Sequence, residues 1–229
     1  AGTGKAFGYP AGGTDKADAC GGCVEEAVLE DYGIYCNNAG GAAASIRSKA
    51  PNAWGLYDMA GNVEEFCWDM YETDYYATSP DTDPLGPADA TVGRAVRGGT
   101  YADAAPELSA YVRSTASNHA RNAARGARFV RSVTNACLAD CSTAECGDDG
   151  CGGSCGDCDG NADLCNEGAC MPADMVWVDA GEFWMGCAPG DTDCDADESP
   201  YHEVTLAGFA VDETEVPMAD YDACEATGP

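Results

Sequence analysis

Hydrophobic side chains along this chain occur in short runs that are separated by glycine-rich turns. Residues 94–97 and 127–130 form two of these runs, and Gly-Gly and Gly-Asn pairs punctuate the sequence around them. Short apolar runs between such turn residues are typical of strands in a loop-rich fold. For residues 1–134 we therefore expect a loop-rich α+β domain rather than a helical bundle.

Residues 171–229 show the same pattern and end in a helical signal. Pro217 opens the predicted helix, which extends through Cys224, because proline suits the first turn of a helix. A segment of this size cannot hide its aromatic side chains alone, so we expect it to complete a core begun by residues 1–134. Its predicted strands are 175–178, 182–185, 204–206 and 209–212.

Cysteine dominates the stretch between these two parts. Eight of the 15 cysteines fall between Cys137 and Cys170, where apolar side chains are scarce. Such a stretch holds a shape only through cross-links, so we expect residues 135–170 to form a disulfide-rich connector. The abundance of cysteine is typical of an exported protein, and the presence of only two histidines, His119 and His202, argues against zinc.

The net charge of the chain is large, and its charged residues are unevenly distributed along the sequence. The chain has 40 acidic and 11 basic residues, for a formal net charge of −29. This balance disfavours nucleic acid and anionic lipid as partners, and no apolar run approaches the length of a membrane span. Every Lys and Arg lies between Lys5 and Arg131, whereas residues 137–229 carry 23 carboxylates and no basic residue. We expect the two ends to attract each other; the alternative is an acidic surface suited to a salty medium.

Two sets of motifs stand out. Residues 51–66 spell PNAWGLYDMAGNVEEF, and RGGTY at 97–101 and GARFVR at 126–131 follow. This set resembles the C-terminal half of the formylglycine-generating-enzyme, or sulfatase-modifying-factor, family, whose members share a C-type-lectin-like fold. The second set resembles the opening of the same family and comprises MVWV at 175–178, GEFWMG at 181–186, ESPYHEV at 198–204 and DETEV at 212–216.

The order of these sets is inverted relative to the family, in which the opening comes first. The resemblance implies a C-type-lectin-like domain that is split or permuted, with residues 1–134 as its C-terminal half and residues 171–229 as its N-terminal half. The chain is then a permuted domain, one period of a longer array, or a pair of halves that complement each other between neighbouring chains. The odd number of cysteines favours a cut array, in which Cys224 has lost its partner.

The resemblance also bears on catalysis. In the oxidase branch of the family, copper(I) is held by thiolates a few residues beyond the Gly-Gly-Ser/Thr-Tyr turn, and sulfur is the ligand that copper(I) prefers. Here the turn at 98–101 continues as ADAAPEL over 102–108, and no cysteine occurs from residue 68 to residue 136. We expect no formylglycine-generating activity, and the two histidines are too few for the iron-dependent sulfoxide synthases that use this fold.

Calcium is the metal that the sequence supports. The run from Asp58 to Glu65 has acidic residues at both ends and a Gly-Asn turn, and calcium binds carboxylate and carbonyl oxygens. The resemblance implies a structural calcium site here, with side-chain oxygens from Asp58 and Glu65 and backbone oxygens from Gly61 and Val63. The family more often has Asn at the first position, so Asp58 adds a charge. The alternative is a strand-edge turn with solvated acids.

A second acidic run covers residues 191–198. It resembles an EF-hand loop, but its sixth position is Ala196 instead of Gly and its twelfth is His202 instead of Glu. We expect a surface loop that a Cys187–Cys194 disulfide closes, with weak cation binding.

The family's active-site groove provides another candidate site. Carried over to this chain, it is lined by Tyr101, Asp103, Arg113 and Arg121, and it implies ligand recognition. Arg113 and Arg121 are also candidates for buried partners of the acidic half, and we prefer that structural role.

These observations favour a non-catalytic, calcium-stabilised extracellular module with a structural or adhesive role, such as a repeat or subunit of a surface filament. A ligand-binding, lectin-like module is the alternative, and an oxidase is the least favoured. We expect residues 171–229 to dock on residues 1–134, and we favour head-to-tail docking between chains or repeats over closure within one chain.

Overall fold

The computed structural model describes two main parts of the chain. The first segment comprises residues 23, 25, 27, 29–88, 92–117 and 122–132, and the second segment comprises residues 174–191, 194–217 and 219–220. Strands β6 (Leu164–Asn166) and β7 (Ala169–Met171) are also described and pair antiparallel. The rest of the expected connector lies outside the described residues.

A four-stranded sheet in the first segment consists of β1 (Glu64–Met70), β2 (Arg94–Arg97), β3 (Ser114–Ala116) and β4 (Arg125–Gly126). The strand order is β3-β2-β1-β4. Strand β1 runs antiparallel to β2 and parallel to β4. Ala95 and Val96 of β2 are buried, so the apolar run that predicts this strand also supplies part of the core.

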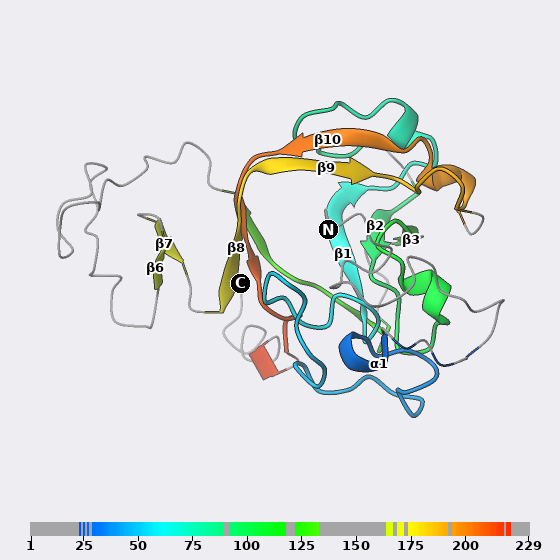
Figure 1. Cartoon of the computed structure of the whole chain (residues 1–229), viewed down its shortest axis with the longest axis vertical. Helices are drawn as coiled ribbons and strands as arrows, with labels where there is room; N and C mark the ends of the chain where they lie inside the picture. The colour runs from blue at the N-terminus through cyan, green and yellow to red at the C-terminus, as the bar shows by residue number, and fades with distance from the viewer. Residues whose placement is uncertain are drawn as a thin grey trace.

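A three-stranded sheet joins the two segments. It consists of β5 (Val130–Ser132), β8 (Met175–Val178) and β11 (Phe209–Asp212). Strand β11 lies in the middle and is antiparallel to both neighbours, with Ala210 paired to Arg131 on one side and to Trp177 on the other. The second segment therefore docks onto the first within one chain (Figure 1), and the docking between chains that we favoured from the sequence stays a prediction.

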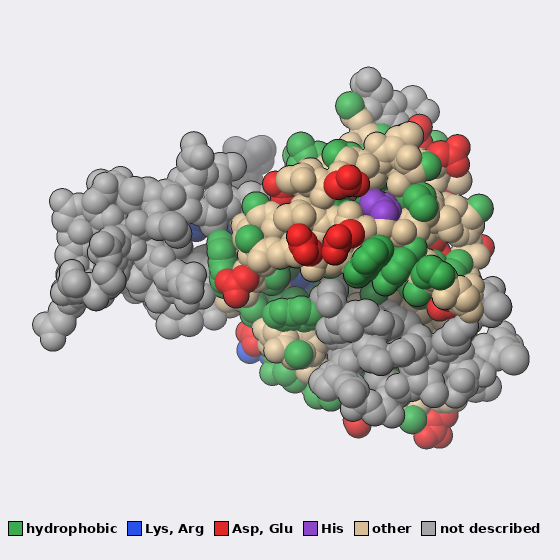
Figure 2. All heavy atoms as spheres, turned by 45° about the horizontal axis from the view of Figure 1, so that its top comes forward, with side chains coloured by type: hydrophobic (Ala, Val, Ile, Leu, Met, Phe, Trp, Pro, Cys, Tyr) green, Lys and Arg blue, Asp and Glu red, His purple; other side chains and the backbone are tan. Residues whose placement is uncertain are grey.

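Strands β9 (Gly181–Met185) and β10 (His202–Leu206) form an antiparallel ribbon. Along β10, Val204 is buried whereas Thr205 is exposed, as the alternation of a strand requires. A loop of the first segment binds the edge of this ribbon, because Thr205 N donates to Asp81 O at 2.8 Å. Figure 1 shows the ribbon across the top of the molecule, and Figure 2 shows this side with acidic side chains beside hydrophobic ones.

A cluster of buried hydrophobic residues belongs to the first segment. Leu29, Tyr35, Ala60, Ala105 and Leu108 pack together there, and burial of a large apolar side chain contributes about 2 kcal/mol. Ala60 belongs to the run from Asp58 to Glu65, so this run packs directly on the core. The helices are short: α1 (Leu29–Tyr32) and the 3-10 helices η1 (Tyr75–Ala77), η2 (Ala105–Leu108) and η3 (Ala196–Glu198).

Most of the predicted strands are present, in a loop-rich fold with few helical residues. The prediction for residues 127–130 is wrong up to Phe129, because the chain passes there from the first sheet to the second. Arg128 points inward at this crossing, while Asp212 N donates to Phe129 O at 3.0 Å and Val216 N donates to Ala127 O at 2.9 Å. Of the predicted helix after Pro217, residues 219–220 are described and are helical.

Among the described residues, no helix has both the length and the apolar character that a membrane crossing requires.

Candidate functional site

The turn that begins at Asp58 is anchored to two neighbouring parts of the chain. Gly61 N donates to Gly98 O at 2.7 Å, and Asn62 N donates to Ile34 O at 2.8 Å. At Gly61 φ is +80° and a Cβ atom would lie 1.9 Å from the oxygen of Ile34, so only glycine fits. Asp58 and Asn62 have φ values of 56° and 62°, which Asp and Asn tolerate better than most residues. The turn therefore has a fixed shape.

Two buried carboxylates meet at this turn, one from each segment. Asp58 and Glu215 are each 3% exposed. Asp58 Oδ2 accepts a hydrogen bond from Arg47 N at 2.8 Å, and Glu215 Oε1 accepts one from Asn62 Nδ2 at 3.0 Å. The second oxygens, Asp58 Oδ1 and Glu215 Oε2, have no hydrogen-bond partner among the described residues. Because buried polar atoms are normally paired, these two oxygens indicate a missing positive or donor group.

Burial and neighbouring charge both oppose the ionisation of Glu215. Its pKa is raised from 4.5 to about 8, first because burial removes water from the carboxylate and then because Asp58 and Glu65 are negative. The hydrogen bond from Asn62 acts in the opposite direction. The three carboxylates therefore lie close enough to repel one another.

Arg128 neutralises one of these carboxylates. Its Nε lies 3.2 Å from both oxygens of Glu65, and its Nη2 donates to Glu65 Oε1 at 2.8 Å. The same guanidinium donates to Tyr57 O at 2.8 Å and to Asp212 O at 3.0 Å. Arg128 thus ties the turn to β11 and matches the charge of Glu65, whereas Asp58 and Glu215 form no ion pair with any residue that the structure describes.

The oxygen-rich cluster suits a hard cation such as calcium. Asp58 fits the predicted ligand role, because its Oδ1 is buried and lacks a partner. Glu65 fits less well, because the guanidinium of Arg128 already binds both of its oxygens. Gly61 and Val63 belong to the same turn and flank Asn62 in the sequence.

The predicted groove residues are used inside the fold. Arg113 is 9% exposed, and its guanidinium carbon lies 4.9 Å from the ring centre of Tyr71 and 4.3 Å from that of Tyr76. Arg113 Nε donates to Asp197 O at 2.9 Å, so this arginine holds the acidic half as we preferred from the sequence. Asp103 Oδ2 accepts hydrogen bonds from both the backbone nitrogen and the hydroxyl of Thr100, each at 2.8 Å.

The other two groove residues are placed differently. Tyr101 is partly buried, and its backbone nitrogen donates to Asn62 O at 2.9 Å. Arg121 lies outside the described residues.

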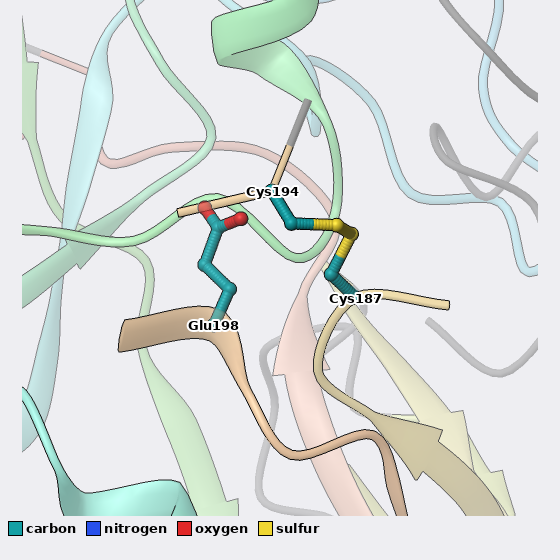
Figure 3. Close-up of side chains that lie close together, drawn as sticks. All are labelled: Cys187, Cys194 and Glu198. Atoms are coloured by element: carbon teal, nitrogen blue, oxygen red, sulfur yellow. A yellow bond between two sulfur atoms is a disulfide. The ribbon is translucent and has the colours of Figure 1, made fainter. Parts of the chain in front are cut away.

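The acidic run after Cys187 forms the disulfide-closed loop that we expected, with only part of it at the surface, and weak cation binding there stays a prediction. The Cys187–Cys194 disulfide is present, but Asp197 and Glu198 are buried. Figure 3 shows the carboxylate of Glu198 beside the disulfide, and Glu198 Oε2 accepts a hydrogen bond from Asp195 N at 3.0 Å. Sulfur atoms in a disulfide offer no thiolate to a metal, so this cluster fixes the loop instead of forming a metal site.

The first segment contains a second disulfide and a free thiol. Cys23 bonds Cys36, and so it does not pair with Cys20, its neighbour at redox-motif spacing. Cys67 on β1 is free, and burial raises its pKa to about 11 against the opposing effect of Arg97. The free thiol of Cys67 explains the odd number of cysteines equally well as the loss of a partner of Cys224. Cys224 lies outside the described residues.

Sequence patterns did not identify Glu215, Asn62 and Arg128 as parts of one site. Glu215 belongs to the DETEV motif and Asn62 to the Gly-Asn turn, but they are 153 residues apart in the sequence. The sequence contains one relevant signal, the excess of carboxylates in the second half. This excess predicts contacts with the arginines of the first half in general, and it does not single out this turn.

Comparison with known proteins supports a family assignment over most of the chain. The family of sulfatase-modifying factor enzyme 1-like domains matches residues 1–133 and 162–228. The formylglycine-generating enzyme of Streptomyces coelicolor is 35% identical over 104 residues, which cover 45% of this chain and 33% of that enzyme. The enzyme of the same name from Thermomonospora curvata is 46% identical over 61 residues, which cover 25% of this chain and 20% of that enzyme.

Two further relatives have other names. The serine/threonine-protein kinase pkn1 of Chlamydia pneumoniae is 38% identical over 92 residues, which cover 39% of this chain and 14% of the kinase. Among solved structures, Treponema denticola variable protein 1 aligns at 30% identity with a TM-score of 0.36, over 45% of this chain and 37% of that one. The alignments thus span a third or less of the curated relatives.

Proposed function

Because the chain belongs to the family of sulfatase-modifying factor enzyme 1-like domains, we propose that it works as a non-catalytic extracellular module of that family, with a structural or adhesive role. Disulfides and a bound calcium ion stabilise this module. Two disulfides among the described residues support an oxidising location, because such bonds persist outside the reducing cytosol.

One observation carries the non-catalytic part of the proposal. The turn at 98–101 leads into a loop where Asp103 binds Thr100, and no cysteine occurs from residue 68 to residue 136. The free cysteine of the described residues, Cys67, is held as a thiol by its raised pKa of about 11. A copper(I) centre of the family type needs thiolates beyond this turn, and the chain lacks them.

Calcium is proposed for the turn that begins at Asp58. The unpartnered Asp58 Oδ1 supplies a charged ligand, and the carbonyl groups of Gly61 and Val63 supply neutral ones. Removal of the ion leaves like charges in a buried space, so a chelator lowers the melting temperature. An unchanged melting curve in excess chelator, together with no calcium in metal analysis, contradicts this part.

Head-to-tail assembly is the finer part of the structural role. The two segments meet through β5 and β11, and the same pairing joins neighbouring chains if the second segment is exchanged. Exposed hydrophobic side chains offer additional contact area; the largest exposed fractions belong to Trp68, Leu85, Val92 and Phe129. Light scattering and electron microscopy of the purified chain distinguish polymers from monomers, and a strictly monomeric chain contradicts assembly.

The test of the non-catalytic proposal is an oxidase assay. A peptide with a sulfatase-type cysteine motif is incubated with copper and the full chain, and the Streptomyces coelicolor enzyme serves as the positive control. We expect no formylglycine product from this chain. Turnover contradicts the proposal and directs attention to the Cys23–Cys36 pair, because Cys36 N donates to Asp103 O at 3.0 Å.

A further inference from the structure

The junction between the segments contains three acidic residues near one described guanidinium. Asp58, Glu65 and Glu215 all interact with Arg128, which pairs with Glu65. Arg47 contributes a backbone N–H to Asp58, and its side chain pairs with Glu213 instead. Asp58 and Glu215 therefore form no ion pair among the described residues, and burial without such a partner strongly disfavours the charged form of a carboxyl group.

The two carboxylates are held in matching ways. Each has one oxygen fixed by a single N–H donor, from Arg47 for Asp58 and from Asn62 for Glu215. Each has its second oxygen buried and without a hydrogen-bond partner among the described residues. Fixed carboxylates with one open oxygen each are the arrangement that a cation ligand requires, since no side chain has to move to bind the ion.

The backbone around Glu215 is fixed by the first segment. Tyr57 N donates to Glu213 O at 2.9 Å on one side, and Val216 N donates to Ala127 O at 2.9 Å on the other. The first segment therefore holds the backbone on both sides of Glu215.

We propose that Glu215 is a ligand of the same cation as Asp58, so that one divalent ion bridges the two segments. This inference rests on the calcium site of the proposed function and changes its composition. Glu215 of the second segment provides the second charged ligand, whereas Glu65 remains bound to Arg128. The paired charges of Asp58 and Glu215 match one divalent cation, and calcium accepts such a set of oxygens.

The bridge gives the ion a role in the docking of the segments. Without the ion, burial and the charge of Asp58 both oppose the ionised form of Glu215 at the junction. With the ion, the same two residues attract it from both sides. Calcium therefore controls how firmly the second segment is held.

Calcium binding to the full chain tests the proposal through a matched pair of variants. After dialysis against chelator, calcium is titrated by calorimetry into the wild type, Glu215→Gln and Glu213→Gln. Glu213 is the control, because it lies two residues away and pairs with Arg47 on the surface. We expect Glu215→Gln to weaken calcium binding at least about tenfold, and Glu213→Gln to change it less than about threefold.

Melting curves provide the second measurement. Calcium raises the melting temperature of the wild type, and this rise is mostly lost in Glu215→Gln. Without calcium, Glu215→Gln melts no lower than the wild type, because the glutamine side chain carries no charge to bury and keeps the hydrogen bond from Asn62. If Glu215→Gln does not fold, Glu215→Asp takes its place, and its shorter side chain also weakens calcium binding.

The outcomes separate the two proposals. If the wild type binds no calcium, both the calcium part of the proposed function and this inference are wrong. If the wild type binds calcium and Glu215→Gln binds it equally well, the calcium site stands and the role of Glu215 is wrong.

Discussion

Asn62 donates a hydrogen bond from Nδ2 to Oε1 of Glu215 at 3.0 Å, and this contact joins positions 153 residues apart. Asn62 also accepts a hydrogen bond from Ala44 N through Oδ1 at 2.9 Å, so its amide orientation is fixed from both ends. The turn of the family motif is therefore tied directly to the second segment. The following predictions test the other contacts that hold this junction together.

Arg128→Met should destabilise the fold strongly. The substitution leaves the buried carboxylate of Glu65 without its partner, and breaking a buried ion pair from one side costs about 3 kcal/mol or more. Urea denaturation measures the loss. Arg47→Met is the control, because its pair with Glu213 lies on the surface and contributes less than about 1 kcal/mol. Equal effects of the two substitutions contradict the assignment of Arg128 as the buried link.

Arg113→Lys should reduce stability by about 2 kcal/mol, because lysine keeps the charge but loses the planar stack on Tyr71 and Tyr76. Thermal melting measures the change. Arg94→Lys is the matched control, since Arg94 stacks on Trp68, which is 82% exposed. If Arg113→Lys leaves the melting temperature nearly unchanged and abolishes binding of a ligand instead, Arg113 belongs to a ligand-binding groove.

Cys67 should resist alkylation in the folded chain. Its raised pKa of about 11 keeps it as a thiol near pH 8, and the thiolate is the reactive form. Iodoacetamide followed by mass spectrometry should modify Cys67 only after urea is added. Fast modification of the native chain contradicts the burial that we describe.

The same thiol should make stability depend on alkaline pH. The folded state holds the proton of Cys67 more tightly than the unfolded state, so its contribution is complete below the ordinary pKa of 9.0 and is lost as pH rises through about 11. Unfolding free energies of the wild type and Cys67→Ala, compared from pH 8 to pH 11, isolate this effect. A constant difference between the two proteins contradicts it.

Replacement of Cys187 and Cys194 together by alanine should cost about 2 kcal/mol. The disulfide closes a short loop, with a sequence separation of 7, and short loops give modest entropic stabilisation. Guanidinium denaturation measures the loss. Reduction of the wild type should lower the melting temperature of the chain, whereas the double variant should lose less on reduction.

The sequence by itself determined the local elements and the family motifs. The apolar runs of β2, β8 and β11 predicted these strands with their observed bounds, because a strand's pattern is contained in neighbouring residues. The absence of cysteine after Gly98 and Gly99 likewise needs no structure to be seen. The opposite charges of the two halves correctly predicted that arginines such as Arg113 hold the acidic half.

Only the tertiary structure decided which groups meet. The crossing between the two sheets brings Arg128 onto Glu65, whose predicted role as a metal ligand stays a prediction, and places Glu215 close enough to Asp58 for their charges to interact. The strand predicted over residues 127–129 is wrong because a local pattern does not show where a chain passes from one sheet to another. Burial and neighbouring charges raise the pKa of Glu215. Both effects depend on which residues lie close in space, even when these residues are far apart in the sequence.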